Sequence, residues 1–249
     1  MDELTWLEGV ISVEAAIRSG NRPIEGVYLR RGKWQREVQQ LRQTAVSANI
    51  PVHTIDDTFI AERVTGQSHG GVLAQVGARR FLSLEALIAH EPAPVVVMLD
   101  GIEDPFNFGQ AVRALYAAGI NGVVVRPRNW LSAAGVVARA SAGASEWMPM
   151  AVAETAVSAA TYYKTHGLTI ACLAQERAVS LFKTDLNRPL FLLIGGEKRG
   201  ITRSFLSQTD LRLQIPYGRP YPQSLGTVAS AAVLGFELMR QRMGLVAGG

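Results

Sequence analysis

The sequence predicts an α/β protein in which a small α/β unit precedes a larger domain built on a parallel sheet. Two observations predict this fold class. Short apolar runs alternate with longer segments whose apolar residues recur at helical spacing, which is the pattern of strand–helix–strand units. In the second half of the chain the short runs are almost continuously apolar, as expected of parallel strands that helices cover on both faces.

Residues 1–80 are expected to form the small α/β unit. Ser12 is placed to cap a helix that ends at Gly20, because a hydroxyl satisfies N–H groups of the first turn and glycine tolerates the left-handed conformation after the last. Asp57 is placed to cap a later helix. The other expected elements are a strand at Val27 and Leu29, a helix through Val38, Leu41, Ala45 and Ala48, a strand over 51–55, and a strand through Val72, Ala74 and Val76.

Residues 81–92 are expected to form a linker, and residues 93–249 a second domain. A short helix from Ser83 to His90 is followed by Glu91-Pro92-Ala93-Pro94. Proline cannot continue a helix and favours extended backbone in the residue before it, so this stretch marks a boundary.

Strands and helices alternate in the predicted second domain. The expected strands are Val95–Leu99, Val123–Arg126, Leu168–Leu173, Leu190–Ile194 and Leu211–Ile215, and the expected helices begin near Phe108, Ser132, Ala153, Ile201 and Gln223. The alternation favours a parallel sheet with helices on its faces.

Three of these strands end in loops that carry glycine, over residues 100–109, 195–200 and 217–226. Ligands of open α/β sheets bind at the carboxyl ends of the strands, where glycine lets the backbone approach closely and leaves N–H groups free. Taken alone, Gly195 and Gly196 fit ordinary turn residues better. The recurrence of such loops after three strands favours a cofactor pocket.

Several common enzyme classes do not fit these loops. A phosphate-binding loop would place lysine where Ile201 stands. A dinucleotide-binding turn would not carry acidic residues and Pro105 after the first strand of the domain. The chain also lacks the Gly-x-Ser-x-Gly elbow of serine hydrolases.

Composition leaves a polyanionic partner open. The formal net charge is +4 and the pI is about 9.5. Seven basic residues against two acidic ones lie between Arg18 and Arg42, compatible equally with solvated charge and with phosphate binding. The single Cys172 and four scattered histidines indicate neither a disulfide nor a metal site. Without an apolar run of ~18 residues or a leader-like N-terminus, a soluble cytoplasmic protein is expected.

Three motifs resemble those of the SpoU/TrmH family of RNA ribose 2'-O-methyltransferases, members of the SPOUT class. The family's first motif is Asn-x-Gly-x-x-x-Arg, the second is Gly-x-Glu-x-x-Gly, and the third is Ile-Pro followed by Ser-Leu-Asn. The matching residues are Asn107, Gly109 and Arg113, then Gly195, Glu197 and Gly200, then Ile215, Pro216, Ser224, Leu225 and Gly226. Residues 139–144 also resemble a family segment, and the order and spacing agree over about 150 residues.

The resemblance implies a fold, a reaction and partners. The fold would be a SPOUT-type parallel sheet with a C-terminal trefoil knot, in a homodimer. The reaction would transfer a methyl group from S-adenosylmethionine to a ribose 2'-hydroxyl of rRNA or tRNA. Residues 1–80, with the turn over 69–72, resemble the ribosomal-protein-like RNA-binding domain of family members.

The resemblance also implies roles for individual residues. Arg113 would be the catalytic arginine, Asn107 would position the nucleophile or the cofactor, and Glu197 would be an orienting carboxylate. Because a guanidinium is effectively always protonated, we interpret Arg113 as gripping a substrate phosphate and stabilising the developing alkoxide, rather than as a base. The residues expected to bind the cofactor are Ile194, Gly195, Gly196, Gly200, Ile215, Pro216, Ser224 and Leu225.

The chain departs from the family pattern at three points. Gly226 stands where the third motif usually has asparagine, Ala114 follows Arg113 where a hydroxyl residue is usual, and one extra residue separates Ile215 from Ser224. The missing amide removes a hydrogen-bond donor and acceptor from the expected pocket. The alternative function is therefore a cofactor-binding but catalytically impaired RNA-binding protein.

Overall fold

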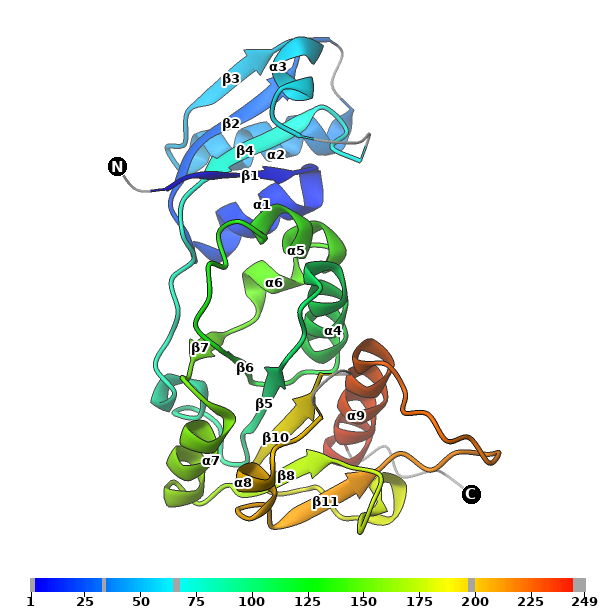
Figure 1. The fold of residues 1–249 in the computed structure, drawn as a ribbon. Coiled ribbons are helices and arrows are strands. Elements are labelled where there is room, and N and C mark those ends of the chain that lie inside the picture. Colours follow the sequence, from blue (N-terminus) through cyan, green and yellow to red (C-terminus); the bar gives the residue numbers. More distant parts are fainter. Residues whose placement is uncertain (1–2, 33–34, 65–67, 197–199, 244–249) are drawn as a thin grey trace. The chain divides into compact units, whose positions relative to one another are not determined.

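The computed structural model describes residues 3–32, 35–64, 68–196 and 200–243, and the chain forms two compact units (Figure 1). The first unit combines Met1–Arg80 with Arg128–Trp147, and the second combines Phe81–Pro127 with Met148–Gly249. A segment from the middle of the sequence thus belongs to the N-terminal unit. The boundaries expected from the sequence, at 80 and 92, stay a prediction.

The first unit contains a four-stranded sheet in which two of the three neighbouring pairs are antiparallel. Its strands, in order across the sheet, are β1 (Thr5–Glu8), β4 (Val72–Val76), β2 (Ile24–Arg30) and β3 (Val52–Ile55), with β3 parallel to β2. Leu7, Val27 and Val72 belong to the buried core that this unit's helices complete. The helices are α1 (Val10–Ser19), α2 (Arg36–Ser47), α3 (Asp57–Ala61), α5 (Ala134–Ala140) and α6 (Ala144–Trp147).

Two predicted helix caps in this unit are wrong. The residue before α1 is Gly9, at φ 83°, and Ser12 is buried within the helix. Asp56, not Asp57, accepts the N–H of Phe59 at 2.9 Å and caps α3. The physical reason is that α1 begins two residues before Ser12 and α3 begins at Asp57 itself, so each of these residues already has helical geometry. The predicted stop at Gly20 is confirmed, because its φ of 63° is left-handed.

The second unit contains a seven-stranded sheet in which every neighbouring pair is parallel, which confirms the predicted fold class. The strand order is β7-β6-β5-β10-β8-β11-β9. All five predicted strands occur, whereas β7 and β9, of three and two residues, were not predicted. The strands are β5 (Val95–Asp100), β6 (Gly122–Val125), β7 (Met150–Val152), β8 (Thr169–Leu173), β9 (Val179–Ser180), β10 (Leu190–Gly195) and β11 (Leu211–Gln214).

Helices flank this sheet, with α4 and α9 at one side and α7 and α8 at the other (Figure 1). They are α4 (Pro105–Ala117), α7 (Ala156–Thr165), α8 (Arg203–Leu206) and α9 (Thr227–Arg242), with 3-10 turns η1 (Glu85–Leu87) and η2 (Leu181–Lys183). Gly235 of α9 lies so close to α4 that a Cβ there would be 3.0 Å from that of Ala118. In the described part of the chain, no helix is long and apolar enough to span a bilayer.

The start of α4 is set by Asp104, whose carboxylate accepts the N–H groups of Phe106 and Asn107. Pro105 occupies the first turn, where its missing N–H has no consequence. The helix therefore begins three residues before the expected Phe108. Helix α9, in contrast, begins later than expected, at Thr227 rather than near Gln223.

Strand order brings the first two motifs together. Strands β5 and β10 are parallel neighbours, and Gly195 pairs with Asp100 at their carboxyl ends. The loops that follow these strands therefore leave the sheet at the same edge. The trefoil knot implied by the resemblance is not defined by strand order, and it stays a prediction.

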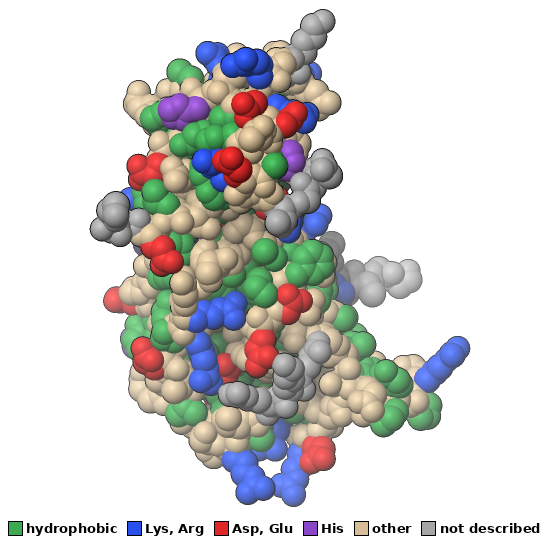
Figure 2. Space-filling view, turned by 45° about the horizontal axis from the view of Figure 1, so that its top comes forward, with side chains coloured by type: hydrophobic (Ala, Val, Ile, Leu, Met, Phe, Trp, Pro, Cys, Tyr) green, Lys and Arg blue, Asp and Glu red, His purple; other side chains and the backbone are tan. Residues whose placement is uncertain are grey.

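Some residues of the basic cluster between Arg18 and Arg42 form ion pairs within the first unit. Arg18 pairs with Glu14 at 2.8 Å, and the buried Arg22 pairs with Glu146 at 2.7 Å. Figure 2 shows Lys and Arg side chains scattered among acidic and apolar ones on the visible face. Arg22 is buried and paired, so it is not exposed for phosphate binding.

Candidate functional site

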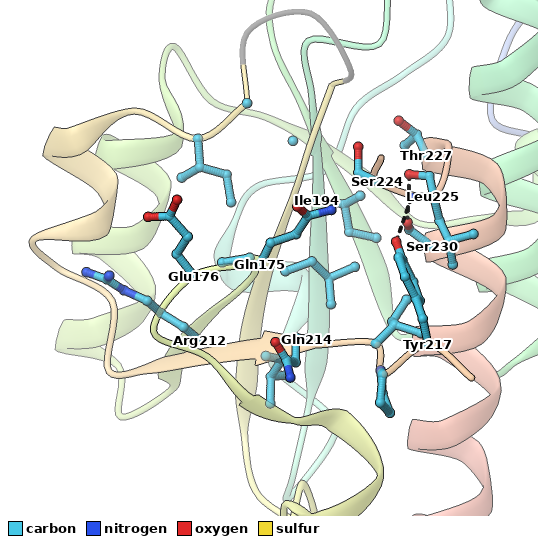
Figure 3. Close-up of a pocket in the computed structure, with 18 of the residues that line it drawn as sticks. Gln175, Glu176, Ile194, Arg212, Gln214, Tyr217, Ser224, Leu225, Thr227 and Ser230 are labelled. Atoms are coloured by element: carbon cyan, nitrogen blue, oxygen red, sulfur yellow. Dashed lines mark hydrogen bonds between the residues drawn. The ribbon is translucent and has the colours of Figure 1, made fainter. Parts of the chain in front are cut away.

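A cavity of about 930 Å³ opens at the carboxyl ends of β8, β10 and β11 in the second unit (Figure 3). Its walls are the residues that follow these strands together with the start of α9. The edge is the one where α/β sheets bind ligands. A cavity of this size accommodates a nucleoside-sized ligand.

The cavity brings together all the residues expected to bind the cofactor. They come from two motifs that are separate in the sequence and from the end of a central strand. The lining residues include Ile194, Gly195, Gly196, Gly200, Ile215, Pro216, Ser224 and Leu225. Their contact with the cofactor itself stays a proposal.

The two glycine turns at the ends of β5 and β10 touch. The N–H of Gly196 donates to the carbonyl oxygen of Asp100 at 2.6 Å. A Cβ on Gly196 would lie 2.1 Å from the carbonyl oxygen of Gly101, a distance that no side chain tolerates. Gly101 itself has a φ of 79°, in the left-handed region. Glycine is thus required at Gly196 by contact and at Gly101 by conformation.

The third motif is held in place by side chains. The Tyr217 hydroxyl accepts the N–H of Leu225 at 3.0 Å, and the Ser230 hydroxyl donates to the carbonyl oxygen of Leu225 at 3.3 Å (Figure 3). Both partners line the cavity. Tyr217 therefore orients Leu225 and occupies its N–H, which sequence reasoning had not anticipated.

Several polar residues of the cavity were missed. Gln175, Glu176 and Arg177 follow β8, and Arg212 and Gln214 lie on β11. In Figure 3 the Glu176 and Arg212 side chains lie on one side of the cavity, away from Tyr217. The available signal was their position, because Gln175, Glu176 and Arg177 directly follow a predicted strand and Gln214 lies near the end of another.

Of the three residues expected to be catalytic, the structure describes two, Arg113 and Asn107. Arg113 is exposed on α4, and Asn107 is half-buried in the first turn of that helix. Neither belongs to the residues that line the cavity. Glu197 lies outside the described residues. Helix α4 follows directly on the Gly101 turn, which contacts Gly196 at the cavity.

An ion pair that the sequence did not reveal lies at the same edge of the sheet. Arg126, which follows β6, donates to both carboxylate oxygens of Asp100, with distances of 2.5 and 2.8 Å. The hydrogen bond that the Arg126 guanidinium donates to the Asp100 carboxylate raises the pKa of Arg126. This bidentate pair fixes the end of β5 next to the Gly101 turn.

Comparison with known families decides the assignment. A model described as the SpoU rRNA Methylase family matches residues 94–236. The chain belongs to this family. The resemblance inferred from the three motifs is thereby confirmed. A second model, described as RNA 2'-O ribose methyltransferase substrate binding, matches residues 6–82.

Relatives in the SpoU family match almost the whole chain. The 23S rRNA (guanosine-2'-O-)-methyltransferase RlmB of Pseudomonas aeruginosa is 29% identical over 246 residues, covering 97% of this chain and 98% of the relative. The RlmB of Shewanella oneidensis is 27% identical over 237 residues, covering 94% and 96%. The match therefore includes both units.

Solved structures of SpoU proteins share the fold. AviRb from Streptomyces viridochromogenes, in complex with the cofactor AdoMet, has a TM-score of 0.78 at 20% identity, covering 97% of this chain and 91% of that one. An AdoMet-bound rRNA methyltransferase from Sinorhizobium meliloti has a TM-score of 0.77 at 22% identity, covering 98% and 88%. The small α/β unit and the parallel sheet are both part of the shared architecture.

Proposed function

We propose that this chain is an S-adenosylmethionine-dependent RNA methyltransferase that methylates a ribose 2'-hydroxyl of rRNA or tRNA. The observation that carries the proposal is that all eight residues assigned to the cofactor line one cavity. The full-length similarity to the two RlmB enzymes supports the same reaction and favours rRNA as the substrate.

The residues of the cavity fit S-adenosylmethionine. Gly196 lines the cavity where the turn packs too closely on Gly101 to carry a side chain, and Ile194 and Ile215 offer apolar walls for the adenine. The Glu176 carboxylate is an acceptor suited to ribose hydroxyls. The bound cofactor supplies an already activated methyl group. The contribution of the chain is alignment, which accounts for much of the catalysis of such displacements.

Arg113 and Asn107 are proposed to act on the RNA side of the reaction. A guanidinium binds phosphate through two parallel hydrogen bonds and stabilises negative charge that develops on the ribose oxygen. Arg113 is exposed, so its donors are accessible to a substrate. Glu197 is proposed as the carboxylate that orients the hydroxyl.

A change of Arg113 to lysine tests this role. The substitution keeps the charge and removes the fork, so we expect methyl transfer to slow by about 100-fold, the usual effect of losing one transition-state donor. Affinity for S-adenosylmethionine should be unchanged. Single-turnover methylation gives the rate, and calorimetric titration gives the affinity. A variant with near-full activity would exclude the bidentate role.

The proposed reaction is tested on RNA from cells that lack the gene. Purified protein and S-adenosylmethionine are added to rRNA and tRNA fractions, and nucleosides are analysed by mass spectrometry. One 2'-O-methylnucleoside is expected to appear in one of the two RNA fractions. It should appear only when both the protein and S-adenosylmethionine are present. Failure to form any such nucleoside, in RNA shown to lack it, would contradict the proposed function.

Gly226 favours one second candidate, a protein that binds the cofactor and RNA without efficient catalysis. It is the residue before α9 and lacks the amide usual in the family motif. Cofactor binding by calorimetry, combined with no methylated product in the RNA assay, would identify this candidate. Calorimetry without any binding would oppose both.

The same proposal includes that the protein forms a homodimer and that it is located in the cytoplasm. Large apolar side chains are exposed on or beside the adjoining helices α4 and α9, with exposed fractions of 48% for Phe106, 42% for Tyr116, 44% for Phe236 and 65% for Met243. Exposed apolar side chains on adjoining elements support association with a second copy. An rRNA or tRNA substrate supports the cytoplasmic location.

A further inference from the structure

A stack of rings covers part of the sheet in the first unit. Tyr28 of β2 is nearly parallel to Phe59, with ring centroids 5.3 Å apart, and to His53, with centroids 4.9 Å apart. The Arg63 guanidinium lies 3.5 Å above the centre of Phe59. Trp6 meets Tyr28 and Phe59 edge-on. Both His53 and Phe59 therefore stack on the Tyr28 ring.

The stack ends at the open edge of the sheet. His53 lies on β3, the last strand of the order, which pairs only with β2 in the described sheet. His53 is exposed, whereas Tyr28 and Phe59 are half-buried. A Cβ on Gly26 would lie 3.3 Å from the His53 ring. The absence of a side chain at Gly26 therefore leaves room for this ring to stack on Tyr28. The outer face of His53 is where a further ring would continue the stack.

A cation adjoins the same strand. The backbone N–H of Arg31 donates to the carbonyl oxygen of Ile55 at 2.8 Å, at the end of β3. The Arg31 side chain is exposed, unlike the buried Arg22 of the same basic cluster. Arg30 pairs with Asp57 at 3.4 Å. An exposed cationic residue therefore lies at the carboxyl end of the strand that carries His53.

We propose that an unpaired base of the RNA substrate stacks on the outer face of His53, with Arg31 near its phosphate. The proposal rests on the proposed function, because it names where the first unit contacts its RNA. Proteins recognise single-stranded RNA by stacking splayed bases on aromatic side chains, including histidine, while basic groups track the backbone. A base within a duplex has both faces covered, so this site selects loops and unpaired ends.

The site is tested with the full chain and a fluorescein-labelled single-stranded oligouridylate. We expect His53→Ala to weaken binding about tenfold, which corresponds to the ~1–3 kcal/mol contributed by one stacked base. His53→Phe should retain the affinity and His53→Lys should not, because the ring and not the charge is required. Thr54→Ala, at the exposed neighbour on β3, should leave binding unchanged.

Two further measurements separate this inference from the proposed function. An RNA duplex of the same length should bind the native protein and His53→Ala equally. Equal oligouridylate binding by the native protein, His53→Ala and His53→Phe would overturn the stacking site, while methylation of rRNA or tRNA by the native protein would leave the proposed function intact. Ring-dependent binding without any methylation would have the opposite meaning: the stacking site would stand and the proposed function would fall.

Discussion

Replacing Gly196 with alanine is expected to weaken the binding of S-adenosylmethionine roughly 100-fold. The new Cβ would lie 2.1 Å from the carbonyl oxygen of Gly101 and 2.5 Å from its carbon. Both atoms are backbone, so the clash is relieved only by moving the turns at the ends of β5 and β10 apart. Overpacking of this kind costs about 3 kcal/mol, and if the displaced turn bears the whole cost, the affinity falls roughly 100-fold.

Calorimetric titration with S-adenosylmethionine measures this effect, and circular dichroism verifies that the variant is folded. Gly218→Ala is the matched control, because no atom lies within 4 Å of a Cβ at Gly218, in the loop that leads to the third motif. This control should bind like the native protein. Native affinity in the Gly196 variant would show that the contact between the turns does not shape the cofactor site.

The cavity was predictable because its determinants are local in the sequence. Apolar runs such as Leu190–Ile194 define parallel strands, and parallel strands must present their carboxyl ends at one edge. Glycine-bearing loops after such strands therefore gather there, whatever the order of the strands. This is why residues as distant as Gly195 and Leu225 were assigned to one site and line one cavity.

Features that depend on strand order or on long-range packing were not predictable. The contact of Gly196 with Gly101 requires β5 and β10 to be neighbours, and the Arg126–Asp100 pair requires β6 beside β5. Neither adjacency leaves a trace in periodicity. Strands as short as β9 have too few residues to show a period. The caps failed because one or two residues decide where a helix starts.

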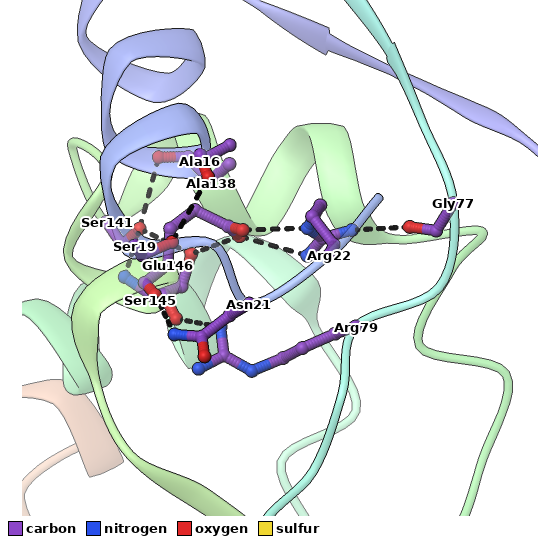
Figure 4. Close-up of polar contacts among 10 residues, drawn as sticks. All are labelled: Ala16, Ser19, Asn21, Arg22, Gly77, Arg79, Ala138, Ser141, Ser145 and Glu146. Atoms are coloured by element: carbon purple, nitrogen blue, oxygen red, sulfur yellow. Dashed lines mark hydrogen bonds and ion pairs between the residues drawn. The ribbon is translucent and has the colours of Figure 1, made fainter. Parts of the chain in front are cut away.

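The inclusion of Arg128–Trp147 in the first unit is another long-range feature, to which apolar packing of Ala134 and Ala138 and a buried polar network contribute (Figure 4). Arg22 donates to both carboxylate oxygens of Glu146, at 2.7 and 3.0 Å, and both side chains are at most 5% exposed. Asn21 donates to the carbonyl oxygen of Glu146 at 2.8 Å, and Arg79 donates to that of Ser145.

Truncating Glu146 to alanine is expected to destabilise the first unit by about 3–5 kcal/mol, because it leaves the Arg22 guanidinium buried without its counter-charge. Arg79 adds to the effect. Burial lowers the pKa of its guanidinium to about 10, against the opposing influence of Glu146, so it remains charged at neutral pH and loses a nearby carboxylate. The midpoint of the thermal transition of this unit should fall by roughly 15–25 °C in calorimetry, because 1 kcal/mol shifts the midpoint of a domain of this size by about 5 °C.

Two variants show whether burial of the charge is the cause. Glu14→Ala removes the partner of Arg18 in an exposed pair on α1, so its effect should stay below about 0.5 kcal/mol. Arg22→Met combined with Glu146→Leu removes both buried charges and should recover much of the lost stability, because apolar side chains of similar volume do not need a counter-ion. If the double variant were as unstable as Glu146→Ala, the loss would come from the charge of Arg79 or from the surrounding hydrogen bonds of Ser141 and Ser145, and not from the unpaired Arg22.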